Sequence, residues 1–332
     1  MKAMMLHHPG MIEDVQLKCE TLDIQEPKES EILIRVKFCA VCRTDLHLIE
    51  GDFPVPELPI IPGHQVVGII EETGDCIDEF KKGERVGVPW MSSTCCRCGY
   101  CRGGTENLCD LAQFTGLDRH GGYAEYITAP GQFVYKLPDE IADHQAAPLL
   151  CSGIIGYRSL KLCGLRSGQK LGIFGFGASA HITIQVAIHL NCEVYVFTRS
   201  EEHRIHAEEL GAVWSGGSND DPGTELDSVL IFAPSGVLMV DSLKNLRKGG
   251  TAVSAGIHMS DIPKFPYRLL YGERVMMSAT NATHQDGLEF LKLASEIPIR
   301  TEVKLYQLEQ ANQALLDLKQ SRIKGAAVLT ID

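Results

Sequence analysis

Five of the twelve cysteines of the chain lie within residues 95–109. Four of them, Cys95, Cys98, Cys101 and Cys109, have the spacing C-x2-C-x2-C-x7-C, and the glycines among them allow the backbone to fold around one centre. Four thiolates about 2.3 Å from one ion form a closed tetrahedral zinc site, which has no open position for a substrate and therefore serves structure. An iron–sulfur cluster is the alternative, because such clusters also use short cysteine spacings. Cys96 falls outside this spacing, and we assign it as a bystander.

Residue types that bind metals or carry protons also occur at three separated places. Residues 42–47 hold a thiol, a hydroxyl, a carboxylate and an imidazole at the end of a predicted strand, and Gly63-His64 and Cys151-Ser152-Gly153 follow further along. Taken singly, a cysteine is more often a small buried hydrophobic residue, and a histidine more often a structural hydrogen-bonding residue. Their combination favours a functional site.

The sequence GFGASA at residues 175–180 matches the pattern G-x-G-x-x-[G/A] of dinucleotide-binding turns. The residues concerned are Gly175, Gly177, Ala178, Ser179 and Ala180. They follow a β-like run and precede a helical pattern, so the glycines permit a tight turn and the helix N-terminus can bind a pyrophosphate. The alternative interpretation is an ordinary turn from a strand to a helix.

About twenty residues beyond this turn, an enzyme that uses NAD has an acidic residue for the ribose hydroxyls. This sequence has Thr198, Arg199 and Ser200 there, with Arg204 one helical turn further. Cations and hydrogen-bond donors suit a 2′-phosphate, so we predict that NADP(H) is favoured over NAD(H). A pair of surface arginines is the alternative.

The elements that must position these groups fall into two parts. The first ~150 residues are predicted to be mostly β, with strands at 31–37, 66–71, 85–88 and 123–128. Strands at 171–174, 193–197, 228–232 and 251–255 then alternate with helices at 178–190, 201–210 and 237–246, which is typical of a doubly wound parallel sheet. A helix at 308–319 and a strand at 326–331 are predicted to return to the first part.

Composition excludes several classes of function. The chain has 332 residues, of which 44% are hydrophobic and 22% charged, and no apolar run long enough for a membrane span. Its formal net charge of −12 repels nucleic acid and anionic lipid, so a small-molecule substrate is expected. Residues 1–9 lack signal-peptide features, so we expect a cytoplasmic protein, in which cysteines bind metal more readily than they form disulfides.

The chain resembles the zinc-containing medium-chain alcohol dehydrogenases, including bacterial alcohol and cinnamyl-alcohol dehydrogenases. The resemblance lies in five motifs that occur in the same order along the chain, around Cys42, His64, Cys95, Cys151 and Gly175. The resemblance covers essentially the whole chain. It implies a GroES-like β catalytic domain at 1–150 and 295–332, a Rossmann cofactor domain at 151–294 and a cleft between them. It also implies hydride transfer between a nicotinamide dinucleotide and an alcohol/aldehyde pair, and a homodimer or homotetramer joined through the sheet edge at 274–278.

The resemblance also assigns roles to single residues. It implies that Cys42, His64 and Cys151 bind a catalytic zinc with one position left open, and that Asp45 orients His64. Thr44 would accept the proton of the alcohol and His47 would pass it on, although Thr44 and Asp45 alternatively cap a helix. The remaining candidates are Arg43 for the pyrophosphate and Phe53, Trp90 and His120 for the substrate pocket.

Three positions depart from the pattern of this family. Gln65 replaces a common glutamate, Ile155 a common threonine near the nicotinamide, and Ala326 a cofactor-contacting arginine of some bacterial relatives. The alternative functions are a polyol dehydrogenase of the same superfamily and a non-catalytic NADP-binding relative. A carboxylate commonly replaces the third zinc ligand in the polyol enzymes, and the relative would have lost its zinc ligands, so Cys42, His64 and Cys151 argue against both.

Overall fold

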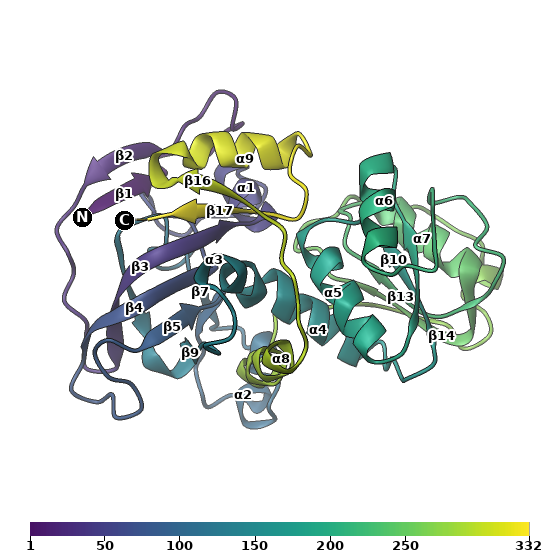
Figure 1. The fold of residues 1–332 in the computed structure, drawn as a ribbon, viewed down its shortest axis with the longest axis horizontal. Coiled ribbons are helices and arrows are strands. Elements are labelled where there is room, and N and C mark those ends of the chain that lie inside the picture. The colour runs from purple at the N-terminus through teal and green to yellow at the C-terminus, as the bar shows by residue number, and fades with distance from the viewer. Residues whose placement is uncertain (332) are drawn as a thin grey trace. The chain divides into compact units, whose positions relative to one another are not determined.

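The chain divides into two compact units in the computed structural model, which describes residues 1–331 (Figure 1). The first unit contains residues 1–151, 281–295 and the chain from 300 onward, and the second contains residues 152–280 and 296–299. The chain therefore passes between the units four times, after residues 151, 280, 295 and 299. None of the helices formed by residues 1–331 has the length and apolar character needed to cross a bilayer.

A mixed seven-stranded sheet forms the centre of the first unit. Its strands run in the order β16 (Val303–Gln307), β17 (Ala326–Thr330), β3 (Glu31–Val41), β4 (Val66–Thr73), β5 (Arg85–Val88) and β9 (Tyr135–Lys136), and β8 (Tyr126–Pro130) also pairs with β3. The alternating Ile32, Ile34 and Val36 of β3 are all buried in the main core. As predicted, the C-terminal strand returns to this unit, where β17 lies antiparallel to β3.

Short elements surround this sheet in the first unit. Strand β1 (Lys2–Met5) pairs with β2 (Lys18–Thr21), and β6 (Met91–Ser93) pairs with β7 (Gln113–Phe114). The helices are α1 (Arg43–Glu50), α2 (Gly99–Arg102), α3 (Asp143–Ala146), α8 (His284–Glu296) and α9 (Ala311–Lys319). Helix α9 lies along β16 and β17 in Figure 1, and its Asp317 accepts hydrogen bonds from Tyr306 (2.7 Å) and Lys304 (2.9 Å) of β16.

The second unit is a parallel six-stranded sheet flanked by helices. The strand order is β12 (Trp214–Gly216), β11 (Glu193–Phe197), β10 (Lys170–Phe174), β13 (Leu226–Ile231), β14 (Leu246–Ser254) and β15 (Val275–Ser278). Helix α4 (Ser152–Leu162) precedes β10, and helices α5 (Ala178–His189), α6 (Glu201–Glu209) and α7 (Gly236–Asn245) follow β10, β11 and β13 in sequence. The chain reverses direction across the sheet after β12, so β10 and β13 are neighbours and the predicted doubly wound fold is confirmed.

The structure differs from the sequence-based prediction in the bounds of several elements and in one domain boundary. The strand predicted at 123–128 begins only at Tyr126, because Tyr123 belongs to an irregular segment whose backbone bonds to Met4 and Pro62. Residues 281–294, which the predicted boundary placed in the cofactor domain, belong to the first unit. The His284 ring stacks on Tyr135 at 4.7 Å between ring centroids, a contact that sequence spacing does not reveal.

Candidate functional site

Three potential metal ligands from distant parts of the chain meet in the first unit. Cys42 follows β3 and precedes α1, His64 precedes β4, and Cys151 ends the first long segment. One ligand atom from each of these residues lies within 4.8 Å of those of the other two. Two sulfurs and one imidazole nitrogen are a donor set suited to zinc, with a fourth position available to another ligand.

Asp45 determines how His64 faces the other two residues. Its Oδ1 atom accepts hydrogen bonds from Nδ1 of His64 (2.9 Å) and from the backbone N–H of Gly63 (3.2 Å), and its Oδ2 atom accepts from the backbone N–H of Cys42 (2.8 Å). Asp45 therefore caps α1 and orients His64 at the same time, so the two alternative roles coexist. With Nδ1 as the donor, the lone pair of Nε2 is free to bind a metal.

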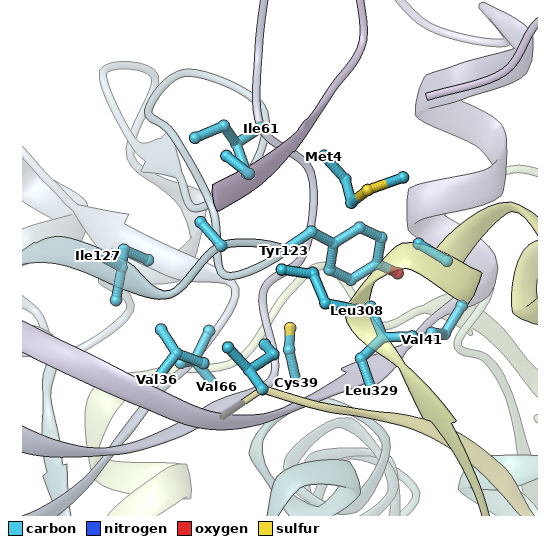
Figure 2. Close-up of a cluster of buried hydrophobic side chains, with 14 of the residues drawn as sticks. Met4, Val36, Cys39, Val41, Ile61, Val66, Tyr123, Ile127, Leu308 and Leu329 are labelled. Atoms are coloured by element: carbon cyan, nitrogen blue, oxygen red, sulfur yellow. The ribbon is translucent and has the colours of Figure 1, made fainter. Parts of the chain in front are cut away.

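Tyr123 completes the environment of Asp45, and the sequence analysis did not identify it. Its hydroxyl group donates a hydrogen bond to Oδ2 of Asp45 at 3.0 Å, and its ring is fully buried. Figure 2 shows this ring in the middle of the apolar cluster that includes Met4, Cys39 and Leu308. Through this phenol the apolar core of the first unit adds one more hydrogen bond to those that hold the Asp45 carboxylate in place.

The electrostatics of this site favour a cation. The Cys151 thiol and the neighbouring His64 hold the pKa of Cys42 well below its usual value, although burial acts to raise it. Burial lowers the pKa of His64, but the charge of Asp45, the hydrogen bond to Asp45 and the proximity of Cys42 outweigh it and raise this pKa to about 10. The Nε2 atom of His64 is nevertheless buried without a hydrogen-bond partner. A metal ion at that nitrogen would satisfy both the orphaned atom and the excess negative charge.

Thr44 and His47 lie one turn apart on α1, so they occupy the same side of the helix. The hydroxyl of Thr44 lies 3.6 Å from the sulfur of Cys42, which puts it beside the three ligands. Nδ1 of His47 lies 2.6 Å from a carboxylate oxygen of Asp52, a residue absent from the predicted site. Gly51, in the left-handed conformation (φ 79°), turns the chain back at the end of α1 and brings Asp52 to His47.

The predicted pocket residues have different surroundings. Trp90 meets the ring of His64 edge-on at 4.7 Å between ring centroids. Phe53 is half-buried against the main core. His120 accepts a hydrogen bond from the backbone N–H of Ile61 at 3.2 Å, which gives it a structural contact. Of the three, Trp90 is the residue for which this geometry supports a role beside His64.

The remaining positions of interest in the first unit are less informative. Arg43 starts α1 and donates to the carbonyl oxygen of Leu318 at 3.4 Å. Gln65 is buried directly after His64, at the position where the family resemblance predicts a glutamate. Ala326 opens β17, and its backbone N–H donates to Glu302. The role of Arg43 toward a pyrophosphate remains a prediction.

The four predicted cysteines lie together in the segment 95–109, which we call the four-cysteine lobe. Their sulfurs lie within 4.8 Å of one another, with Cys98 and Cys101 3.4 Å apart and Cys95 and Cys101 3.9 Å apart. A tetrahedron with zinc–sulfur bonds of 2.3 Å has edges of roughly 3.8 Å, so the lobe fits a single ion better than a cluster of several irons. Backbone N–H groups of Arg97 and Cys98 lower the pKa of Cys95 to about 6.

Cys96 points away from the other cysteines of the lobe. It has a left-handed backbone (φ 56°) and is exposed, and its sulfur contacts Thr94 and Gln132 instead. The structure therefore groups the four cysteines chosen by spacing and leaves the fifth outside.

The glycine-rich turn joins β10 to α5 in the second unit. Gly175 has a φ of 86°, and a Cβ atom there would lie 2.8 Å from Cβ of Ala233, so no other residue fits. Gly177 precedes the first residue of α5, and a Cβ atom there would meet nothing within 4 Å. The N-terminus of α5 thus opens onto free space of the kind that a pyrophosphate requires.

The residues predicted to choose the cofactor lie at the same edge of this sheet. Phe174 and Phe197 are paired in register at the ends of β10 and β11, so the turn after Phe174 and Thr198 lie next to each other. The guanidinium of Arg204 donates to the Thr198 carbonyl at 3.1 Å and pairs with Glu201 at 3.4 Å. The remaining two have simple surroundings: Arg199 is exposed, and Ser200 caps α6 by accepting from the N–H of His203.

Comparisons with known proteins agree with this geometry. Residues 28–139 match the family model described as the alcohol dehydrogenase GroES-like domain. A probable alcohol dehydrogenase AdhA from Mycobacterium tuberculosis is 44% identical over 100% of this chain and 97% of its own. A cinnamyl alcohol dehydrogenase from Sorghum bicolor is similar with a TM-score of 0.90, 25% identity and coverage of 98% of this chain and 97% of its own.

A cobalt- and zinc-bound thermostable alcohol dehydrogenase from Pyrobaculum aerophilum has a TM-score of 0.91 and 25% identity, over 99% of both chains. The near-complete coverage and the identity of the mycobacterial relative extend over both units of the chain. The chain belongs to the medium-chain alcohol dehydrogenase family.

Proposed function

We propose that this protein is a zinc-dependent alcohol dehydrogenase that transfers hydride between NADP(H) and a primary or aromatic alcohol/aldehyde pair. The observation that carries the proposal is the buried, orphaned Nε2 atom of His64, which Asp45 directs toward the sulfurs of Cys42 and Cys151. A non-catalytic relative would have no reason to keep this arrangement. Membership of the alcohol dehydrogenase family supports the reaction class.

Cys42, His64 and Cys151 would hold the catalytic zinc, which supplies a Lewis acid for the substrate oxygen. Asp45 keeps His64 in the tautomer that binds metal, and Tyr123 and the backbone of Cys42 keep Asp45 in place. Thr44 accepts the hydroxyl proton of the substrate, and His47 carries it toward solvent. Asp52 orients the imidazole of His47 through their 2.6 Å contact.

The second unit would bind the cofactor at the edge formed by Gly175, Gly177 and the start of α5. Arg199, Ser200 and Arg204 would surround the 2′-phosphate of NADP(H), with Thr198 in place of the carboxylate that would repel it. The subunits would associate through β15, which is the last strand of the sheet and has an exposed Val275. Light scattering that gives a monomer at micromolar concentration would rule out this dimer or tetramer.

A steady-state assay with metal control tests the proposed function. The purified protein should oxidise primary and aromatic alcohols and reduce the matching aldehydes, lose this activity on dialysis against a chelator and regain it with Zn2+. Polyols form the comparison set, because turnover of polyols alone would favour the polyol dehydrogenase alternative. Metal-independent turnover, or no turnover of any alcohol by protein that contains zinc, would contradict the proposal.

Cys101→Ser is expected to remove about one zinc per subunit and lower the melting temperature, because the four-cysteine lobe has few buried apolar side chains of its own. Cys96→Ser is the matched control, since Cys96 is in the same lobe but outside the sulfur cluster. Metal analysis and thermal unfolding of both variants provide the measurement. Two zincs per subunit and unchanged melting in Cys101→Ser would show that the lobe is not a metal site.

A further inference from the structure

Trp90 is held at a fixed angle beside His64 by contacts on three sides. Its ring stacks on Phe114 at 4.9 Å with an interplanar angle of 14°, and it meets His64 edge-on at 4.7 Å with an angle of 70°. The indole Nε1–H donates a hydrogen bond to Oδ1 of Asn281 at 3.1 Å. Stacking alone lets an indole turn within its own plane, so the hydrogen bond to Asn281 is the contact that fixes this rotation.

Asn281 also contacts the four-cysteine lobe. Its amide Nδ2 donates to the backbone carbonyl of Asn107 at 3.4 Å, and Asn107 lies between Cys101 and Cys109. Three residues further along, the backbone N–H of His284 donates to the carboxylate of Glu106 at 2.8 Å. The segment 281–284 is thus attached to the lobe by two hydrogen bonds, although it is far from the lobe in sequence.

The backbone of Asn281 supports a specific role. Its φ of 52° lies in the left-handed region, which side chains other than glycine, asparagine and aspartate rarely adopt. Asparagine is the member of this group that offers both an acceptor for the indole and a donor for the lobe. One side chain therefore satisfies the backbone geometry and joins two parts of the first unit.

We propose that Asn281 is a specificity-determining positioning residue, which links the four-cysteine lobe to Trp90. It would fix the orientation of the Trp90 ring beside His64, against which bulky substrates pack. The inference rests on the proposed function, because the substrate is placed at the site of Cys42, His64 and Cys151. In this view the lobe shapes substrate choice in addition to stabilising the fold. A small alcohol does not contact the Trp90 ring, whereas an aromatic substrate packs against it, so the effect of changing Asn281 should depend on substrate size.

A double-mutant cycle tests whether Asn281 acts through Trp90. The readout is the ratio of kcat/KM for benzyl alcohol to that for ethanol. We expect Asn281→Gly, which suits the left-handed backbone, to lower this ratio at least fivefold, mainly through KM for benzyl alcohol. In a Trp90→Phe background, which has no indole N–H, the same change should alter the ratio less than twofold.

Two outcomes would overturn this part of the proposal. One is an unchanged ratio in Asn281→Gly, and the other is that Asn281→Gly changes the ratio equally in the wild-type and Trp90→Phe backgrounds. The matched control is Asn191→Gly, because Asn191 also has a left-handed backbone (φ 60°) but is exposed and in the second unit. It should leave the ratio unchanged, whatever it does to stability. A normal turnover of both alcohols together with an unaffected ratio would refute the inference and leave the proposed function intact.

The link to the lobe is tested without turnover, through fluorescence. The chain has two tryptophans, so in a Trp214→Phe background the emission comes from Trp90 alone. We expect Cys101→Ser to shift this emission when residue 281 is asparagine. In Asn281→Asp the same change should shift it less than half as far, because aspartate keeps the acceptor for the indole but lacks the amide donor to Asn107. Glu106→Ala, which loosens the lobe without changing a cysteine, is the second perturbation with the same expected pair of results. Equal shifts with asparagine and aspartate, or no shift from either perturbation, would overturn the link.

Discussion

Replacing Cys42 or Cys151 by serine is expected to lower kcat by about a hundredfold or more, because the bound metal supplies several kcal/mol of transition-state stabilisation and each 1.4 kcal/mol is worth tenfold. Cofactor binding should stay largely intact, because the glycine-rich turn and Arg199 belong to the second unit. Stopped-flow kinetics measure kcat, metal analysis measures the zinc content, and fluorescence titration with NADPH measures cofactor binding.

Cys39→Ala is the control for these variants. Cys39 is a fully buried cysteine on β3, three residues before Cys42, but its sulfur bonds to the carbonyl of Ala40 and it is outside the ligand cluster. This variant should keep both its metal and its turnover. A Cys42→Ser or Cys151→Ser protein with more than about a tenth of the wild-type kcat would show that the catalytic zinc assignment is wrong.

The second large effect concerns the choice of cofactor. We expect kcat/KM with NADPH to exceed that with NADH by on the order of a hundredfold, because two charge-assisted hydrogen bonds to the 2′-phosphate contribute roughly 1.5–3 kcal/mol each. Arg199→Ala should lose about tenfold or more with NADPH and little with NADH. Arg204 is the less clean site to change, because its guanidinium also holds the carbonyl of Thr198.

Arg166→Ala is the matched control for Arg199→Ala. Arg166 is also exposed and belongs to the same unit, but it precedes β10 and therefore lies at the opposite edge of the sheet from the glycine-rich turn. Its replacement should leave kcat/KM unchanged with both NADPH and NADH. Equal efficiencies of NADPH and NADH with wild type, or no loss with NADPH in Arg199→Ala, would refute the assignment of the phosphate site.

The parts of the fold that the sequence predicts are those with local signals. Strand β11 was predicted with its observed bounds, Glu193–Phe197, and helix α5 to within one residue, because a glycine-rich turn separates one periodic pattern from the next. The sulfur cluster of the four-cysteine lobe was likewise predicted from spacing. Its four members lie within fifteen residues, so the chain between them has little freedom to separate them.

The residues that the sequence could not predict are those that act through distant contacts. Tyr123 lies 78 positions from Asp45, and Asn281 lies 191 positions from Trp90. Neither hydrogen bond leaves a periodic pattern in the chain, because each depends on packing between segments. Asp52 could have been predicted from the sequence, since it lies five residues after His47 and directly after a glycine that ends a helix. The role of His120 in a substrate pocket stays a prediction, and the structure adds that its ring accepts a hydrogen bond from the backbone of Ile61.

The pairing of β17 with β3 has a consequence for the order in which the protein matures on the ribosome. Residues 152–280 are contiguous, so this part of the second unit can assemble while the last fifty residues are still being synthesised. Residues 38–41, which immediately precede Cys42, receive their β17 partner only when residues 327–330 have been made. We therefore expect the metal site to mature last, and a nascent chain halted before residue 326 to expose the apolar edge of β3 to chaperones or to other unfinished chains.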